Sequence, residues 1–233
     1  MSADPIDEGG TSIRVLRATR PAEIERTARL LREGGVVVVP TDTLYALSAS
    51  IFQRQASERV FAIKGRLSGR PVPLLLATAA DLPLVVAAVP RIAWRLIEAY
   101  WPGPLSLVLP ARSSVPAQLR GGGKTVAVRV PSARSCLELL ELIGEPIIGT
   151  SANRSGRPAS RFADEVVRQL GNQPDAILCD DAAVGGGPAS SVVEIAEERL
   201  IVHRDGAISA EEIRRVAGVR LIVRSYVESG RLG

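Results

Sequence analysis

Residues 146–156 read PIIGTSANRSG. The first half is apolar and has the composition of a short buried strand. The second half then presents four small polar side chains, Thr150, Ser151, Asn153 and Ser155. In α/β folds, ligands bind where loops leave the ends of strands, so this stretch favours a cradle for a nucleotide or an amino acid. A plain turn or a helix N-cap is the alternative interpretation.

The same alternation of apolar strands and helices extends outward from 146–156. Expected strands lie at 36–40, 73–77, 105–110, 125–131, 146–150, 175–180, 191–196 and 199–204. Expected helices lie at 21–32, 55–65, 90–101, 132–144 and 163–171, and from Ser209, where Glu212 completes a capping box. The class is therefore α/β, and the hairpin-like neighbours 191–196 and 199–204 make the sheet mixed.

The rest of the chain is expected to be organised around one core. The segment 41–47, TDTLYAL, is expected to be a polar loop. Residues 1–12 are interpreted as a flexible segment, 13–218 as one domain, and 219–233 as a tail that adds an edge strand and then frays. The acidic start MSADPIDEGG does not resemble a secretory signal, and no apolar run approaches the roughly 20 residues of a membrane span. We expect a cytoplasmic protein with no membrane partner.

Charge and reactive side chains narrow the function classes. The chain has a net charge of +4, and 27 of its 29 cationic residues are arginine, which leaves Lys64 and Lys124 as the lysines. A lysine kept in such a chain suggests a point-charge contact to phosphate. Cys136 and Cys179 lie in separate apolar runs, so neither a disulfide nor a zinc cluster is expected. His203, the single histidine, is interpreted as structural, which leaves no Ser-His or Cys-His catalysis.

Several polar loops leave the expected strand ends, at 40–43, 64–70, 121–125, 150–156, 185–191 and 203–206. They offer hydroxyls, backbone amides, a carboxamide and cations, which are the groups that hold phosphates. The loop GGGKT at 121–125 is not a P-loop, because Gln118 stands where that motif needs glycine and a strand follows. We interpret it as a turn with a solvated lysine.

The order and spacing of these fragments are more specific than any one of them. The chain contains PTDTLYAL, a K-x-R, WPGPLSLVL, VAVRVP, TSANRSGRP, SSVVE and an R-x-G, in that order. This series resembles the YrdC family of threonylcarbamoyl-adenylate synthases over about residues 13–215. The resemblance implies a twisted, open mixed sheet flanked by helices, with a concave basic cavity.

The resemblance also implies a reaction and its partners. Members of the family convert L-threonine, bicarbonate and ATP, with Mg²⁺, into threonylcarbamoyl-AMP and pyrophosphate. A separate transferase complex uses the product to modify position 37 of tRNA, and weak direct binding of tRNA is a further expectation. No side chain need act as the nucleophile, because the carbamate of threonine must only be placed in line with the α-phosphate.

The site residues follow from the resemblance position by position. The nucleotide and phosphate clamp, which is also the expected catalytic set, falls on Lys64, Arg66, Ser151 and Asn153. Further nucleotide contacts fall on Arg70, Thr125 and Arg204. The positions that hold threonine are Thr43, Arg129 and Ser190, with Arg129 as a fork for the carboxylate. No residue is expected to bind a resident metal.

Four positions depart from the pattern of the family. Ser106 and Ser191 stand where threonine is usual, and each keeps a hydroxyl. Leu67 replaces a common proline after the K-x-R. Ala46 replaces a glycine, and its methyl group matters if that backbone needs a positive φ or touches the substrate.

Three other functions stay open from the sequence. One is a protein of the same fold that binds RNA or ribosomes without synthesis. Another is a paralogue with a different substrate. A third is a carbamoyl-adenylate module of hydrogenase maturation, which would need zinc-finger and acylphosphatase-like regions that this sequence does not contain.

Overall fold

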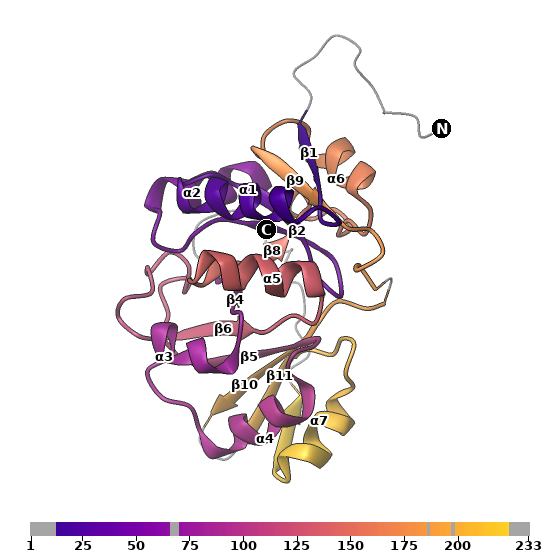
Figure 1. The fold of residues 1–233 in the computed structure, drawn as a ribbon. Helices are drawn as coiled ribbons and strands as arrows, with labels where there is room; N and C mark the ends of the chain where they lie inside the picture. Colours follow the sequence, from indigo (N-terminus) through magenta and orange to yellow (C-terminus); the bar gives the residue numbers. More distant parts are fainter. Residues whose placement is uncertain (1–12, 66–69, 186, 197–198, 224–233) are drawn as a thin grey trace, which may run out of the picture.

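The computed structural model describes residues 13–65, 70–185, 187–196 and 199–223, and shows a mixed α/β protein (Figure 1). The helices are α1 Pro21–Arg32, α2 Arg54–Lys64, a 3₁₀ turn at Ala79–Asp81, α3 Leu82–Val85, α4 Arg91–Tyr100, α5 Arg134–Ile143, α6 Ala163–Leu170 and α7 Ala210–Ala217. The strands are β1 Arg14–Arg17, β2 Val37–Pro40, β3 Tyr45–Ser48, β4 Leu74–Leu75, β5 Leu105–Pro110, β6 Thr125–Arg129, β7 Ile147–Ile148, β8 Thr150–Ser151, β9 Ala176–Cys179, β10 Ser191–Ala196, β11 Arg199–Arg204 and β12 Arg220–Val223.

The strands are divided between two mixed sheets. The first sheet has the order β1-β9-β2-β3-β8, and the second has the order β12-β11-β10-β5-β6-β4-β7. In the first, β2 pairs parallel with β9 and antiparallel with β3. In the second, β10 pairs antiparallel with β11 and parallel with β5. The α/β class and the mixed pairing predicted from the sequence are therefore confirmed.

The chain crosses from one sheet to the other between β7 and β8. β7 pairs with β4 in the second sheet, and β8 pairs with β3 in the first. Gly149 separates them, and a Cβ atom at this position would lie 2.5 Å from Cγ of Leu75. A side chain cannot fit there, so glycine allows the crossing. The TSANRSG loop begins at this junction between the sheets.

Strands β2 and β3 of the first sheet are buried on both faces. Val38 and Leu47 contribute to the larger apolar cluster, whereas Val37, Val39 and Ala46 contribute to a second cluster under α1 and α5. Successive side chains of a strand point to opposite faces, so both clusters are filled from the same strands. This double burial explains why 36–40 reads as an unbroken apolar run.

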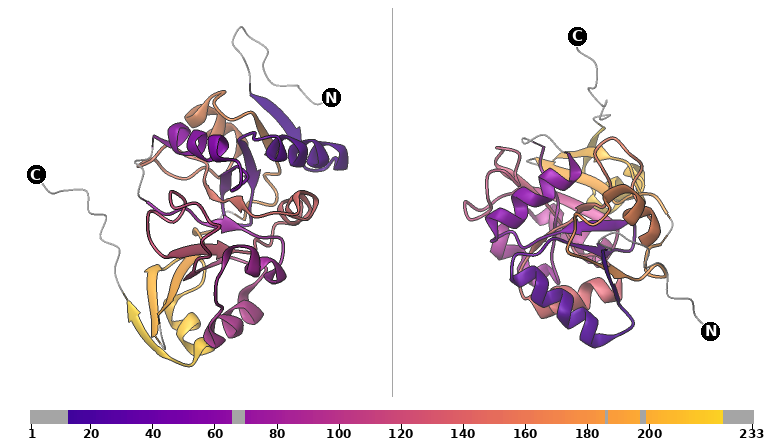
Figure 2. Two further views of the ribbon diagram at one scale, coloured as in Figure 1. Left: turned by 90° about the vertical axis from the view of Figure 1, so that its left-hand side faces the viewer. Right: turned by 90° about the horizontal axis from the view of Figure 1, so that it is seen from above.

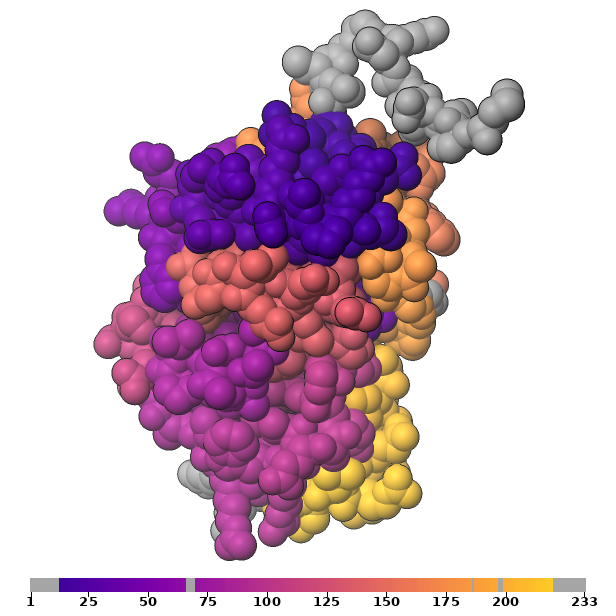
Figure 3. Space-filling view, viewed as in Figure 1, coloured from indigo at the N-terminus to yellow at the C-terminus, as the bar shows by residue number. Residues whose placement is uncertain are grey.

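Helices cover the sheets in two groups. In Figure 1, α1, α2 and α6 lie around the first sheet, and α4 and α7 pack together beside the second. Figure 2 shows the same division, with the indigo α1 and the yellow C-terminal elements at opposite ends of the molecule. The space-filling view in Figure 3 shows α1 lying directly against α5, which spans the middle of this face. Within the described ranges, no helix is both long and apolar enough to span a bilayer.

Most elements expected from the sequence are present. The helix at α1 and the capping box of Ser209 and Glu212 on α7 are confirmed. β12 pairs with β11 at the sheet edge, as expected for the start of the tail. The expectation of a polar loop at 41–47 is wrong in its second half, which forms β3 because Tyr45 and Leu47 are fully buried. The segments 1–12 and 224–233 lie outside the described residues.

Candidate functional site

Lys64 lies at the centre of the first polar cluster. It is the last residue of α2, which ends at Gly65 in the left-handed conformation, and it is 4% exposed. Its ammonium donates to the carbonyl oxygen of Ser151, to the carbonyl oxygen of Asn153 at 2.9 Å, and to Asn153 Oδ1 at 3.2 Å. We call Lys64, Ser151 and Asn153 the lysine cluster. The structure thus brings together three of the four residues predicted for the phosphate clamp.

Asn153 organises the loop around this lysine. It is 7% exposed, and its Nδ2 donates to the carbonyl oxygens of Arg154 at 3.1 Å and Arg157 at 2.6 Å. Both ends of the carboxamide are therefore bonded within the chain. A buried amide needs such partners, so these contacts already account for asparagine at this position. Its contact with a ligand stays a prediction.

Ser151 is the member of the cluster with an available hydroxyl. It is partly exposed, and within the described residues its Oγ has no hydrogen bond. Ser151 pairs with Ala46 across β8 and β3, so the two side chains share one face of the sheet. Ala46 lies in a regular strand, which means that its backbone does not need a positive φ. Its methyl group is 4% exposed and packs in the second apolar cluster, on the face of the sheet that also carries Ser151.

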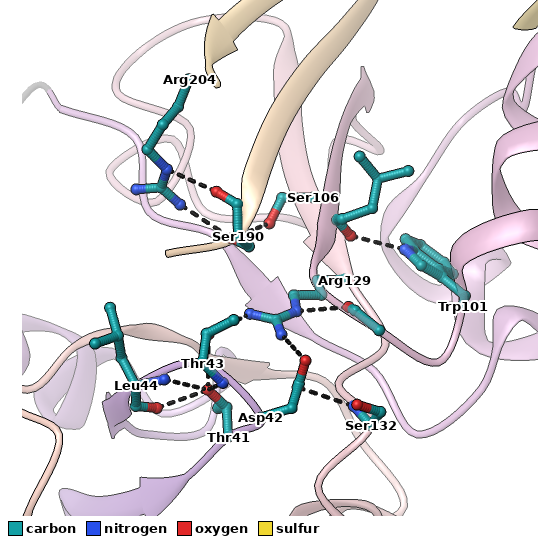
Figure 4. A network of polar contacts seen from close by, with 12 residues as sticks. Thr41, Asp42, Thr43, Leu44, Trp101, Ser106, Arg129, Ser132, Ser190 and Arg204 are labelled. Atoms are coloured by element: carbon teal, nitrogen blue, oxygen red, sulfur yellow. Dashed lines mark hydrogen bonds and ion pairs between the residues drawn. The ribbon is translucent and has the colours of Figure 1, made fainter. Parts of the chain in front are cut away.

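Arg129 lies at the centre of the second polar cluster, which Figure 4 shows from close by. It ends β6, and its side chain is 6% exposed. Its Nε donates to the carbonyl oxygen of Gly103 at 2.9 Å, its Nη1 to Thr43 Oγ1 at 3.0 Å and its Nη2 to Asp42 Oδ2 at 2.6 Å. Asp42 and Thr43 follow β2 of the first sheet. Arg129 therefore joins the two sheets through a buried ion pair and a hydroxyl contact.

The 41–44 loop is held in shape by Thr41. Its Oγ1 donates to the carbonyl oxygen of Leu44 at 2.6 Å and accepts from the backbone amides of Thr43 and Leu44 at 3.3 and 3.2 Å. Such bonds between a threonine hydroxyl and nearby backbone stabilise a tight turn. The turn presents Asp42 and Thr43 to Arg129 (Figure 4).

Ser190 and Arg204 continue this cluster into the second sheet. Ser190 is buried, and Arg204 donates to its carbonyl oxygen from Nε at 2.7 Å and to its Oγ from Nη2 at 2.9 Å. Ser106 Oγ lies 3.2 Å from Ser190 Oγ. We call Asp42, Thr43, Arg129, Ser190 and Arg204 the arginine cluster. It contains the three residues predicted to hold threonine and one of the predicted nucleotide contacts.

The two serines that replace threonine in the family pattern both use their hydroxyl groups. Ser106 contacts Ser190, as described above. Ser191 Oγ accepts from the amides of Gly206 at 3.1 Å and Ile208 at 3.0 Å and donates to the carbonyl oxygen of Ile208. Ser191 therefore fixes the 204–208 turn against β10, where it supports Arg204.

The electrostatics of the arginine cluster are dominated by burial and by repulsion between cations. Burial lowers the pKa of Arg129, and the neighbouring carboxylate of Asp42 opposes this effect. Partial burial, and then the positive charge of Arg129, lower the pKa of Arg204. The two guanidinium groups are therefore close enough to repel each other. An anion placed between them would relieve this repulsion.

The remaining predicted residues lie less centrally or outside the described ranges. Arg70 is exposed, and Thr125 begins β6, at the opposite end of that strand from Arg129. Neither side chain has a hydrogen bond to the described part of the chain. Arg66, the fourth member of the predicted clamp, and Leu67 lie outside the described residues.

The histidine, the two cysteines and Lys124, for which no catalytic role was expected, lie outside both polar clusters. His203 Nε2 lies 2.7 Å from Glu194 Oε2 on the neighbouring strand. Cys136 is buried, Cys179 is partly buried, and neither forms a disulfide. Lys124 is exposed in a glycine turn, as expected. Among the described residues, no group of three or more His, Cys, Asp or Glu side chains could hold a metal ion.

Two surface grooves lie outside both clusters. One, of about 400 Å³, lies beside the lysine cluster and is lined by Arg154, Arg157, Pro158, Arg168 and Gln169. The other, of about 280 Å³, is lined by Pro21, Glu25, Glu138, Glu141 and Leu142 of α1 and α5. Neither is lined by a predicted site residue. The concave basic cavity implied by the family resemblance therefore stays a prediction.

Asp42 and Thr41 take part in the polar network around Arg129, and neither was predicted from the sequence as a site residue. Both lie inside the PTDT segment, which was noted for its hydroxyl groups. A signal for Asp42 was present, because it is a carboxylate among strand-end loops rich in cations. Such a carboxylate is expected to pair with an arginine once both are buried.

Comparisons with known proteins identify the family of the chain. The family model Sua5_yciO_yrdC, described as telomere recombination, matches residues 29–206. The chain is 36% identical over 196 residues to threonylcarbamoyl-AMP synthase of Pyrococcus abyssi, covering 84% of this chain and 57% of that protein. It is 33% identical over 202 residues to threonylcarbamoyl-AMP synthase of Bacillus subtilis, covering 86% of this chain and 58% of that protein. The chain thus spans little more than half the length of these two relatives.

A solved structure extends the similarity to the fold. The crystal structure of P. abyssi Sua5 complexed with L-threonine superimposes with a TM-score of 0.83 at 34% sequence identity. The match covers 91% of this chain and 63% of that chain. That structure therefore contains the same arrangement of strands and helices with an amino acid bound.

Proposed function

This chain belongs to the Sua5/YciO/YrdC family, and from that premise we propose that it is a threonylcarbamoyl-AMP synthase. In the proposed reaction, the amine of L-threonine combines with carbon dioxide derived from bicarbonate to give a carbamate. A carbamate oxygen then attacks the α-phosphorus of ATP, and the bond between the α- and β-phosphates breaks. The products are threonylcarbamoyl-AMP, pyrophosphate and the water released from bicarbonate.

The observation that carries the proposal is a pair of buried cations, each of which contacts a residue next to β3 in sequence or in the sheet. Lys64 is 4% exposed and Arg129 is 5% exposed. Arg129 contacts Thr43, just before β3, and Lys64 contacts Ser151, which pairs with Ala46 inside β3. Three residues of extended chain span at most about 11 Å, so the two contacts are close. This spacing suits an amino acid held next to a nucleotide phosphate.

The arginine cluster is the proposed site for the amino acid. Thr43, Arg129 and Ser190 offer two hydroxyls and a guanidinium, which are the groups that bind a carboxylate and a polar side chain. Arg129 has five N–H donors, of which three are bonded within the protein. The threonine complex of P. abyssi Sua5, which shares this fold, supports an amino acid as the ligand.

The lysine cluster is the proposed site for the phosphates. Lys64 and the hydroxyl of Ser151 would contact the α-phosphate, and Asn153 would hold their loop in place. We propose Arg66, Arg70, Thr125 and Arg204 as further contacts to the nucleotide. Since the described residues contain no cluster of carboxylates for a metal, we propose that Mg²⁺ arrives as part of the substrate MgATP, bound mainly by phosphate oxygens.

The protein would act by positioning and by charge. Holding the carbamate in line with the α-phosphate removes most of the entropic cost of the encounter. The cations would stabilise the negative charge that develops on the departing pyrophosphate. Among the described residues, the His203 side chain is bonded to Glu194 and to no member of either cluster, so it has no role in this scheme.

We further propose that the protein works in the cytoplasm, where its product would be used. A separate transferase complex would transfer the threonylcarbamoyl group to adenosine 37 of tRNA. The names of the relatives support synthesis of the adenylate, and the tRNA step is what the resemblance to the YrdC family implies.

Pyrophosphate release by the purified protein tests the proposal. With MgATP and bicarbonate, release should depend on L-threonine and fall at least roughly 100-fold in a Lys64→Met variant. Arg54→Met is the matched control, because Arg54 is an exposed cation at the other end of the same helix. Nucleotide binding without dependence on threonine would indicate another substrate. RNA binding with no affinity for ATP would replace the proposal with an RNA-binding function.

A further inference from the structure

Asp42 is the acidic partner of the buried Arg129 in the described structure. Its Oδ2 accepts from Arg129 Nη2 at 2.6 Å, and its side chain is 15% exposed. A buried guanidinium without a counter-charge is strongly unfavourable, so the carboxylate stabilises Arg129 in its charged form. The cluster then contains the charges of Arg129, Arg204 and Asp42, which sum to +1.

Asp42 is itself fixed from several directions. Its Oδ1 accepts from the backbone amide of Ser132 at 2.9 Å, and its carbonyl oxygen accepts from Gly185 at 3.2 Å. A Cβ atom on Gly185 would lie 2.7 Å from that carbonyl oxygen, so only glycine permits this approach. The carboxylate therefore has a defined position, and it can define the position of the group that it contacts.

The contacts of Arg129 leave a particular set of donors. Its Nε–H goes to Gly103, one N–H of Nη1 goes to Thr43, and one N–H of Nη2 goes to Asp42. One donor therefore remains on each terminal nitrogen. Two donors on one planar group match the two oxygens of a carboxylate.

We propose that Asp42 is a positioning residue for the amino-acid substrate, which it serves by orienting Arg129 and neutralising part of its charge. This inference rests on the proposed function. It assigns Asp42 to the threonine side of the reaction and not to the ATP side. The carboxylate of a bound amino acid would lie against the net charge of +1 that Asp42 leaves in the cluster.

The test is the Asp42→Asn variant. Asparagine keeps the acceptor for the amide of Ser132 but loses the charge that faces Arg129. We expect the KM for L-threonine and the Kd for L-threonine measured by calorimetry to rise at least roughly tenfold, which is the effect of losing a charge-assisted hydrogen bond. The KM for ATP should change less than about threefold. Asp42→Glu, which restores the charge, should recover part of the loss.

Asp175→Asn is the matched control. Asp175 also accepts from an arginine, Arg59, and from a backbone amide, that of Val36, but it lies at the other end of β2 from Asp42. Its replacement should lower stability and leave the threonine parameters unchanged. If Asp42 had a purely structural role, Asp42→Asn would likewise lower stability and leave the KM and Kd for L-threonine unchanged.

The outcomes separate the inference from the proposed function. A folded Asp42→Asn variant that binds L-threonine as tightly as the wild type overturns the inference. If Asp42→Asn does not fold, the Asp42→Glu variant is the test. Moving the carboxylate by one methylene should raise the KM for threonine, and an unchanged KM overturns the inference. If the wild type binds threonine but releases no pyrophosphate, the proposed function fails, and the calorimetric loss in Asp42→Asn still supports the role of Asp42.

Discussion

Replacing Lys64 by methionine should reduce stability as well as activity. The ammonium donates to three oxygens of the 151–153 segment, and all three lose a charged donor in Lys64→Met. A hydrogen bond to a charged group contributes about 1.5–3 kcal/mol, so the three bonds give an upper limit of roughly 5–9 kcal/mol. Methionine keeps most of the apolar stem and removes the desolvation penalty of a buried ammonium, which offsets several kcal/mol.

The expected net loss is therefore about 3 kcal/mol in the free energy of unfolding. For a protein of this size, 1 kcal/mol shifts Tm by about 2–4 °C, so Tm should fall by roughly 6–12 °C. Urea unfolding and differential scanning calorimetry measure the two quantities. The control Arg54→Met should stay within about 0.5 kcal/mol of the wild type, because the side chain of Arg54 is 89% exposed.

One result would refute this reasoning. If Lys64→Met loses activity but keeps the Tm of the wild type within 2 °C, the ammonium does not hold the 151–153 segment in the free protein. Lys64 would then act on the ligand alone, and the contacts to Ser151 and Asn153 would have no energetic role.

Three further effects follow from other parts of the structure. Gly206→Ala should lower the free energy of unfolding, measured in urea, by about 3 kcal/mol, because a Cβ atom would overlap the carbonyl oxygen of Ala189. The same overlap would push the backbone away from Ser190, so initial rates should show a higher KM for threonine. Native Cys136 should resist iodoacetamide at pH 8, as judged by mass spectrometry, because burial raises the pKa of its thiol to about 12. Asp175→Asn should lower the free energy of unfolding at pH 7 by roughly 0.5–1 kcal/mol, because the pKa of Asp175 lies below its ordinary value. Burial alone would raise this pKa, but the hydrogen bonds from Arg59 and Val36 outweigh that effect.

Each of these effects has a control or a contrary outcome. Gly187→Ala should be nearly neutral, since its Cβ would have ordinary contacts, and equal costs at Gly187 and Gly206 would contradict the packing argument. Rapid labelling of Cys136 in the folded protein would show that its cover opens easily. For Asp175, a depressed pKa gives stability that is present above about pH 4 and is lost as the pH falls through the folded-state pKa. A difference between wild type and Asp175→Asn that persists unchanged at pH 2.5 would contradict the ion pair with Arg59.

Much of the fold could be predicted from the sequence because its elements have strong local signals. The helix of α1 shows the 3.6-residue spacing of Ile24, Ala28 and Leu31, all of which are buried. β2 could be recognised because burial on both faces makes an unbroken apolar run. In contrast, β3 was expected to be a loop, since its neighbours Thr41 and Thr43 are polar and its pairing with β2 is a tertiary contact.

The division into two sheets could not be predicted from local patterns. The segment 146–150 reads as one strand, yet β7 and β8 belong to different sheets. What separates them is the close approach of Gly149 to Leu75, two residues far apart in the sequence. Such a contact has no signature within either segment.

The sequence predicted which residues belong to the candidate site, but it did not predict most of the contacts among them. The family resemblance implied that Lys64 acts together with Ser151 and Asn153 of the TSANRSG loop, and the structure brings these three residues together. The role of Asn153 as an organiser of that loop, and the pairing of Arg129 with Asp42, depend on partners from other strands. These partners become visible only once the two sheets are assembled.

The origin of the carbonyl carbon in the product tests the central claim most directly. The protein would be incubated with ATP, Mg²⁺, L-threonine and ¹³C-bicarbonate, and the nucleotide products analysed by mass spectrometry. We predict a threonylcarbamoyl-AMP that carries one ¹³C atom, formed together with pyrophosphate and absent when threonine is omitted. The proposed synthase would be contradicted if the protein binds both ATP and threonine but its nucleotide products contain no threonyl group or no ¹³C label.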